Sequence, residues 1–156
     1  MTDKPLWHYT LARDSHLGAI RRSGRINPEQ VEWALAPAVW LSTDQHFEPT
    51  ACKGKFVGQT RVTCTVDEML PVAARIGIRS DCPNLLRWRD FKTEATARFG
   101  ASGHQKIGKQ FRNMEKVARD QGADPINWYA SFDPIPVEQW TRIETFADGR
   151  WIKVTP

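Results

Sequence analysis

The feature that most constrains this fold is a pair of β-type segments in the first fifty residues, separated by one amphipathic helix. Residues 5–10 and 38–42 combine aromatic, branched and hydroxyl side chains, which favours strands. Between them, residues 14–24 place Leu17 and Ile20 on one face and end at Gly24, as a short helix packed on a sheet would. Both strands mix core side chains with groups that can hydrogen-bond to a ligand or stack on it. We therefore expect a small-molecule pocket at the strand ends.

Further strands are predicted on both sides of a helical middle. Residues 59–66 alternate between apolar and polar side chains, and residues 69–78 continue with apolar side chains. Late in the chain, strands are expected over residues 127–132, 140–146 and 150–154. The last two are joined through Ala147-Asp148-Gly149, because Asp-Gly is a strong hairpin signal.

The middle of the chain has the spacing of amphipathic helices. Residues 85–99 place Trp88, Phe91 and Ala95 together, and residues 104–121 place on one side Ile107, Phe111, Met114 and Val117. Residues 29–35 are predicted to form a further short helix. Strands that bracket a helical middle predict an α+β fold with a mixed or antiparallel sheet, and the length fits a single domain over residues 1–156.

The cysteines and the hydropathy pattern are typical of a cytoplasmic protein. Cys52, Cys64 and Cys82 form no Cys-x-x-Cys pair and leave one thiol over from any disulfide scheme, so we expect them to be reduced. No apolar run approaches the length of a membrane span, and the first residues lack a signal-peptide pattern. We expect a cytoplasmic location without membrane insertion.

Several common kinds of site are not indicated. His8, His16, His46 and His104 are scattered, without the spacing of metal ligands, so no metal is expected. The chain contains neither a phosphate-binding glycine-rich loop nor a Gly-x-Ser-x-Gly nucleophile elbow. Nothing in the sequence points to a Cys–His nucleophile pair. The candidates that remain are the polar groups on the two early strands and the acidic residues that could approach them.

The helical segment at about residues 83–122 is basic. Its second half carries only two acidic residues, Glu115 and Asp120, against Lys106, Lys109, Arg112, Lys116 and Arg119. A solvated helix face is the simpler explanation and is favoured. The alternative is a surface that follows phosphates of a nucleic acid or binds a charged protein target. The formal net charge of +4 permits an anionic partner without requiring one.

The two early strands resemble the nicotinamide adenine dinucleotide (NAD) site of the ADP-ribosyltransferase superfamily. That superfamily opens with a strand carrying His, a small or polar residue, and Ser or Thr, here His8-Tyr9-Thr10. A helix ending in Gly follows, and a second strand brings an aromatic residue and a small polar one, here Trp40 and Ser42. Poly(ADP-ribose) polymerases, tRNA 2′-phosphotransferases and DNA-targeting ADP-ribosyltransferase toxins begin similarly. The resemblance covers residues 6 to about 50 and, more weakly, the last thirty.

The resemblance implies a split sheet with NAD bound as a substrate. His8 would hydrogen-bond to a ribose hydroxyl, and the backbone of Tyr9 would hold the nicotinamide amide. Thr10 would brace the strand or bond to the ribose. The nicotinamide pocket would be completed by Trp40, Ser42 and Phe47. A histidine between Trp7 and Tyr9 is equally compatible with a satisfied core position, so this role of His8 remains a prediction.

The superfamily also supplies a glutamate from a late strand, and here the sequence departs from it. The best match to that strand is residues 127–133, in which Trp128 stands where Glu is expected. A carboxylate is needed because cleavage of the nicotinamide–ribose bond creates positive charge at the sugar. Glu48, on the loop after Ser42, is the first substitute, and Glu138 is the second.

Two functions follow as expectations. The first, favoured one is an enzyme that transfers ADP-ribose from NAD to an acceptor, or a related NAD-consuming or 2′-phosphate-transferring activity. The second is a non-catalytic module on the same fold that binds a nucleotide or nucleic acid, which Trp128 at the acid position favours. The sequence leaves the acceptor open among protein, DNA, RNA and small molecules.

Overall fold

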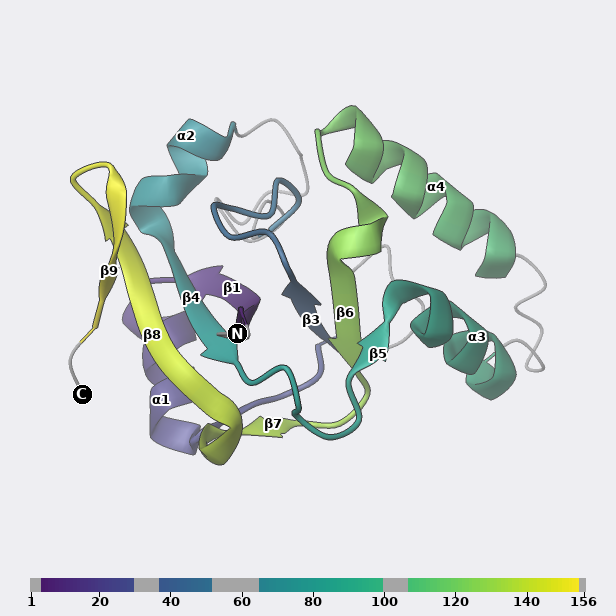
Figure 1. Cartoon of the computed structure of the whole chain (residues 1–156), viewed down its shortest axis with the longest axis horizontal. Helices are drawn as coiled ribbons and strands as arrows, with labels where there is room; N and C mark the ends of the chain where they lie inside the picture. The colour runs from purple at the N-terminus through teal and green to yellow at the C-terminus, as the bar shows by residue number, and fades with distance from the viewer. Residues whose placement is uncertain (1–3, 30–36, 52–64, 100–106, 155–156) are drawn as a thin grey trace.

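The sheet at the centre of the fold is entirely antiparallel. The computed structural model describes residues 4–29, 37–51, 65–99 and 107–154, and within them seven strands pair in the order β5-β6-β3-β1-β4-β8-β9 (Figure 1). Their bounds are β1 Leu6–Leu11, β3 Val39–Ser42, β4 Ala73–Ile78, β5 Leu86–Arg87, β6 Trp128–Ser131, β8 Trp140–Ala147 and β9 Arg150–Lys153. A separate two-stranded ribbon pairs β2 Arg25–Ile26 with β7 Ile135–Pro136.

The main sheet loosens between β1 and β3. Strand β1 pairs with β4 along its whole length, from Leu6↔Ile78 to Leu11↔Ala73. Its register with β3 has a single pair, Trp7↔Ser42. Strand β3 pairs fully with β6 instead, from Val39↔Ser131 to Ser42↔Trp128. The β1–β3 register is therefore the shortest in this seven-stranded sheet.

Four α-helices are found among the described residues. They are α1 Ala19–Ser23, α2 Val66–Met69, α3 Trp88–Phe99 and α4 Ile107–Asp120. Helix α1 continues a π-helical turn, Asp14–Gly18, and ends at Gly24, whose φ of 69° lies in the left-handed region that favours glycine. Helices α3 and α4 lie beside the β5–β6 end of the sheet, and the β8–β9 hairpin forms the other end (Figure 1).

Three buried clusters form the core. The first joins α3 and α4 to β6 through Trp88, Phe91 and Trp128. The second lies among the central strands and includes Leu41 and Ile76. The third contains Trp7, Tyr9 and Phe47, together with Met69 at the end of α2. The site described below lies where the strands that carry these clusters meet.

Most of the predicted elements are present. The α+β class, both early strands, the helix ending at Gly24, the strand over residues 128–131 and the Asp-Gly hairpin are confirmed. The sheet is antiparallel, which was one of the two expected arrangements. No helix among the described residues is long and apolar enough to span a bilayer.

Three predicted details are wrong. Leu86 begins a short strand, not a helix, because it pairs with Ala130 of β6. Val117 is half exposed and Ala118 takes the buried position on α4. Val66 starts helix α2, because the side chain and backbone of Thr65 form a capping box with Glu68.

Some predictions fall outside the described residues. These are residues 30–35 of the helix predicted over 29–35, residues 59–64 of the strand predicted over 59–66, and Cys52, Cys64, His104 and Lys106. Glu29 itself forms an antiparallel bridge with Ala38, so the predicted helix does not begin there. Cys82 is a free, buried thiol, as expected for a reduced cysteine.

Candidate functional site

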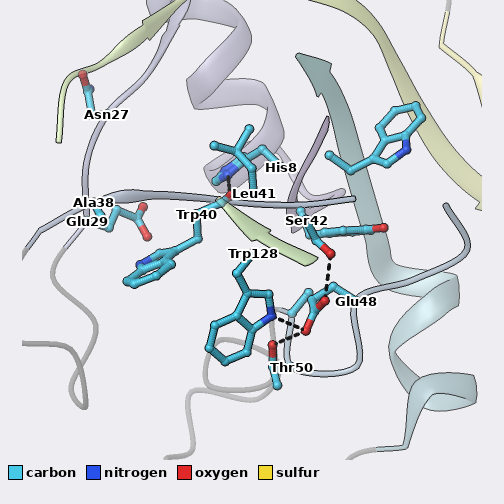
Figure 2. A pocket seen from close by; sticks show the side chains of 13 residues that line it. His8, Asn27, Glu29, Ala38, Trp40, Leu41, Ser42, Glu48, Thr50 and Trp128 are labelled. Atoms are coloured by element: carbon cyan, nitrogen blue, oxygen red, sulfur yellow. Dashed lines mark hydrogen bonds between the residues drawn. The ribbon is translucent and has the colours of Figure 1, made fainter. Parts of the chain in front are cut away.

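A cavity of about 130 Å³ opens where β1 and β3 separate. Strand β1 contributes Trp7, His8 and Tyr9 to its lining, and β3 contributes Trp40, Leu41 and Ser42. The opposite side is formed by Trp128 of β6 and by the loop that follows β3 (Figure 2). Asn27 and Glu29, which follow β2, also line the cavity, so residues far apart in the chain meet at one small space.

The most distinctive group in this cavity is the buried carboxylate of Glu48, which is 5% exposed. Its Oε2 accepts a hydrogen bond from Ser42 Oγ at 2.8 Å. Its Oε1 accepts one from Thr50 Oγ1 at 2.8 Å and one from the indole Nε1 of Trp128 at 3.0 Å (Figure 2). These donors replace the water that a carboxylate loses on burial. Because a carboxylate has about four acceptor sites, Oε2 retains capacity for one further donor.

The loop that carries Glu48 is ordered by its own side chains. Asp44 Oδ1 accepts hydrogen bonds from the backbone N–H groups of His46 and Phe47, at 2.9 and 3.1 Å. Ser42 Oγ accepts one from the N–H of Asp44 at 3.1 Å. Such local side-chain-to-backbone bonds are typical of Ser and Asp in tight turns. They turn the chain back so that Glu48 lies against the strand that begins the loop.

The imidazole of His8 on β1 contacts the backbone of β3. Its Nδ1 lies 2.9 Å from the backbone oxygen of Trp40, and a carbonyl oxygen only accepts, so Nδ1–H is the donor. In the neutral ring this assigns the acceptor role to Nε2. His8 therefore links the two halves of the sheet at the cavity wall.

Two indole rings form the apolar wall of the cavity. Trp40 packs edge-on against Phe91 at 5.1 Å between centroids, and Trp128 packs edge-on against Trp88 at the same distance. Both contacts fix the rings against helix α3, which supplies Trp88 and Phe91. The wall is therefore rigid, and it offers an apolar surface to a planar ligand.

The charged groups of the described lining are acidic. Among the described residues, the lining contains Glu29 and Glu48 and no Lys or Arg. The buried carboxylate of Glu48 would attract a positively charged ring. Elsewhere among the described residues, no group of three His, Cys, Asp or Glu side chains gathers as a metal site would.

The structure brings together most of the predicted site residues. The cavity lining contains His8, Tyr9, Trp40, Ser42 and Glu48. The hydroxyl of Tyr9, however, points to the loop, where it donates to Asp44 O at 3.1 Å. The hydroxyl of Ser42 is engaged with Glu48, so Ser42 positions the carboxylate.

Three predicted residues lie elsewhere. Thr10 is buried in β1 and Phe47 in the third core cluster, and neither belongs to the described lining. Glu138 is exposed on a 3₁₀ turn, Val137–Gln139, which follows β7. The first of the two candidate glutamates is thus in the cavity and the second is not.

Sequence reasoning did not identify Thr50, Asn27 and Glu29, which also line the cavity. It treated Trp128 only as a departure from a family pattern, whereas Trp128 contacts Glu48 directly. The Glu48-Pro49-Thr50 spacing is the one local signal for Thr50, because a hydroxyl two residues after a carboxylate can reach it. Asn27 and Glu29 give no comparable signal.

Comparison of the chain with protein-family models, with curated proteins and with solved structures finds no match. Any assignment of function therefore depends on the geometry and chemistry of the cavity itself.

Proposed function

We propose that this chain is an NAD-consuming enzyme of the ADP-ribosyltransferase type, with Glu48 as its essential carboxylate. One observation carries the proposal: a buried glutamate lies in a ring-sized cavity at the split of the sheet, held there by Trp128. In the resemblance described above, Trp128 occupies the strand position of the catalytic glutamate. The loop after β3 would thus place a carboxylate beside the strand position that carries the catalytic glutamate in that superfamily.

The size of the cavity supports a single ring as its occupant. A cavity of about 130 Å³ is close to engineered cavities of about 150 Å³ that bind benzene, and below the roughly 300–1,000 Å³ of sites for larger ligands. The nicotinamide ring of NAD fits that volume, whereas the whole dinucleotide does not. The ribose would lie at the cavity mouth, within reach of the lining, and the phosphates and adenine would lie outside it.

The charge of the lining supports the oxidised form of the nucleotide. The nicotinamide ring of NAD carries a positive charge, and the lining offers the carboxylate of Glu48 and the face of Trp40. An attraction for a positively charged ring favours NAD cleavage over a 2′-phosphate transfer, in which the transferred group is anionic.

The proposed step breaks the bond between the ribose C1′ and the nicotinamide nitrogen. The bonding electrons leave with nicotinamide, which becomes neutral, and positive charge develops on the ribose. Glu48 Oε2 has capacity for one more donor. It would accept a hydrogen bond from a ribose hydroxyl, and the carboxylate would stabilise the positive charge on the ribose. An acceptor nucleophile then bonds to C1′ and loses its proton. His8 also lies in the lining, on the β1 side, where it would contact the ribose.

Glu48→Gln is the direct test. The amide keeps the shape of the side chain but removes the charge, and we expect nicotinamide release to fall by about 10²–10³-fold. The matched control is Glu138→Gln, which changes an exposed glutamate outside the cavity and leaves release unchanged. Release is followed by mass with purified protein, NAD and cell extract as the source of acceptor. Absence of release by the wild type, with no thermal stabilisation by NAD, overturns the proposal.

A second function is favoured by the surface of α4. Four side chains on this helix are exposed and basic: Lys109, Arg112, Lys116 and Arg119. A non-catalytic module that binds a nucleotide in the cavity and nucleic acid on α4 would use the same fold. It predicts affinity for a labelled oligonucleotide that falls steeply with salt, without nicotinamide release. Affinity independent of salt, or unchanged in Lys109→Gln/Lys116→Gln, excludes this role of α4.

A further inference from the structure

We propose that Arg75 and Trp151 are positioning residues that clamp the Glu48 loop onto the sheet and so set the rate of the chemical step. This inference rests on the proposed function for its kinetic part only. Neither residue lines the cavity among the described residues. Both act through the backbone of the loop between Ser42 and Glu48.

Side chains from the sheet satisfy three consecutive carbonyl oxygens of this loop. Tyr9 Oη donates to Asp44 O at 3.1 Å, and Arg75 Nη1 donates to Gln45 O at 2.8 Å. His46 O accepts from Trp151 Nε1 at 2.7 Å and from Arg75 Nη1 at 3.3 Å. The donors come from β1, β4 and β9, so three strands hold one short loop.

Arg75 is fixed by the sheet on several sides, which leaves Nη1 for the loop. It is 5% exposed, and its Nε and Nη2 both contact Glu144 Oε1, at 2.8 and 2.7 Å. Its guanidinium lies between two indoles, 3.8 Å from the centroid of Trp7 and 4.2 Å from that of Trp151. The ion pair and the stacked rings fix the plane of the guanidinium, which directs Nη1 at the loop.

The clamp extends to the loop side chains next to Glu48. Trp7 Nε1 donates to Gln45 Oε1 at 3.1 Å, and the Phe47 ring stacks against Trp151 at 6.5 Å between centroids. Phe47 precedes Glu48 in the chain, so its ring anchors the backbone immediately before the carboxylate. The hydrogen bonds from Ser42, Thr50 and Trp128 fix the carboxylate of Glu48, and the clamp fixes the backbone that precedes it.

This arrangement matters for catalysis because electrostatic stabilisation depends on a carboxylate that is already in place. A displacement of about 1 Å in a reacting group can lower a rate about 10²-fold. The C-terminal hairpin is far in sequence from the Glu48 loop, with a separation of 105 residues between His46 and Trp151, yet it supplies Trp151 and Glu144 to the clamp. Strands β1, β4, β8 and β9 thereby position the Glu48 carboxylate, which contacts Ser42 of β3 and Trp128 of β6.

The first test uses Trp151→Phe and needs no ligand. Phenylalanine keeps a ring beside Arg75 but removes the donor to His46 O. We expect amide hydrogen exchange in residues 43–48 to speed up by about fivefold, as for the loss of one hydrogen bond. The control is Trp140→Phe, which removes an indole donor to Ile135 O on the same β8–β9 side of the sheet and leaves this loop unchanged.

The second test is kinetic and uses Arg75→Lys beside Trp151→Phe. We expect kcat for nicotinamide release to fall about tenfold in each, with KM changed less than twofold, because substrate contacts remain. The double variant Arg75→Gln/Glu144→Gln removes both buried charges. We expect its kcat to fall further than that of Arg75→Lys, which keeps the positive charge. A structural role without positioning would leave kcat per folded molecule unchanged.

The outcomes separate the two proposals. Unchanged exchange of residues 43–48 in Trp151→Phe, relative to Trp140→Phe, overturns the clamp whatever the enzyme does. Faster exchange with wild-type kcat overturns the positioning role. Faster exchange in a protein whose wild type releases no nicotinamide supports the clamp and counts against the proposed function.

Discussion

At the scale of single residues, the site depends on a contact that the linear sequence does not reveal. Trp128 and Glu48 are 80 residues apart, and their hydrogen bond exists because β6 pairs with β3 in a register that places Trp128 opposite Ser42. Residue types indicated that Glu48 was a candidate, since its loop follows Ser42. They could not show that Trp128 would hydrogen-bond to this glutamate, because that contact depends on strand register.

Tyr9 provides a residue-scale prediction about pH. Burial raises its pKa well above the ordinary 10.0, although the hydrogen bond and charge of Arg75 act in the opposite direction. A raised pKa means that the folded state favours the protonated phenol. Its contribution to stability is therefore full below pH 10 and is lost as the pH rises above it.

The measurement uses the only other tyrosine as a handle. Tyr129→Phe leaves Tyr9 as the single tyrosine of the chain. We expect the folded variant to show no tyrosinate absorbance at pH 10, where the same protein in urea is half ionised. In Tyr9→Phe, the fall in unfolding free energy above this pH should become shallower. Equal ionisation in buffer and in urea would contradict the prediction.

At the scale of elements, the turn signals were the most reliable part of the sequence. Asp148 and Gly149 have φ of 54° and 77°, the pair of positive angles that an Asp-Gly hairpin turn requires. Periodicity was less decisive at helix boundaries. Leu86 fits a helix by spacing but pairs with β6, because tertiary packing overrides local propensity there. On α4, Ala118 continues the helical spacing of Phe111 and Met114 and is buried with them, whereas Val117 lies outside this face.

The hairpin turn gives an element-scale prediction. Gly149→Ala places a side chain at φ of 77°, where nothing lies within 4 Å of the added Cβ, so the cost is backbone strain without a clash. We expect the free energy of unfolding to fall by about 1–2 kcal/mol. Urea denaturation measures this change.

Gly149→Asn is the control for the hairpin, because Asn tolerates left-handed angles better than Ala. We expect it to lose less than half as much stability as Gly149→Ala. The hairpin carries Trp151, so Gly149→Ala should also loosen the loop over residues 43–48. Equal stability of the two variants would show that φ at this turn is not limiting.

At the scale of the whole molecule, the cavity lies at the junction of two independently supported halves. One half is the β5-β6-β3 side with α3 and α4, which supplies Trp40 and Trp128, and the other is the β1-β4-β8-β9 side, which supplies His8 and the clamp (Figure 1). The fold class could be predicted from the order of elements. The resemblance implied a split sheet, whereas the structure has one seven-stranded sheet with a short β1–β3 register. The length of that register could not be predicted, because it depends on how many residues pair between the two strands.

The proposed function predicts which part of NAD enters the cavity. If only the nicotinamide ring enters a space of about 130 Å³, nicotinamide alone should compete with NAD, although it should bind more weakly because the free ring is uncharged, and AMP should not displace nicotinamide. NADH should bind more weakly than NAD, because its ring is uncharged and the lining contains the carboxylate of Glu48. Ligand at 100 times its Kd stabilises the fold by about 2.7 kcal/mol, which thermal denaturation detects readily.

Ala38→Leu is the variant that isolates the cavity in this comparison. Ala38 is buried in the lining, and a larger side chain there would fill space that a ring needs. We expect stabilisation by nicotinamide and by NAD to be lost together while that by AMP, if any, persists. Val137→Leu, at an exposed position outside the described lining, should leave all three ligands unaffected. If AMP rather than nicotinamide lost its effect in Ala38→Leu, the cavity would be an adenine site, and Glu48 would then lie at the wrong end of the dinucleotide for bond cleavage.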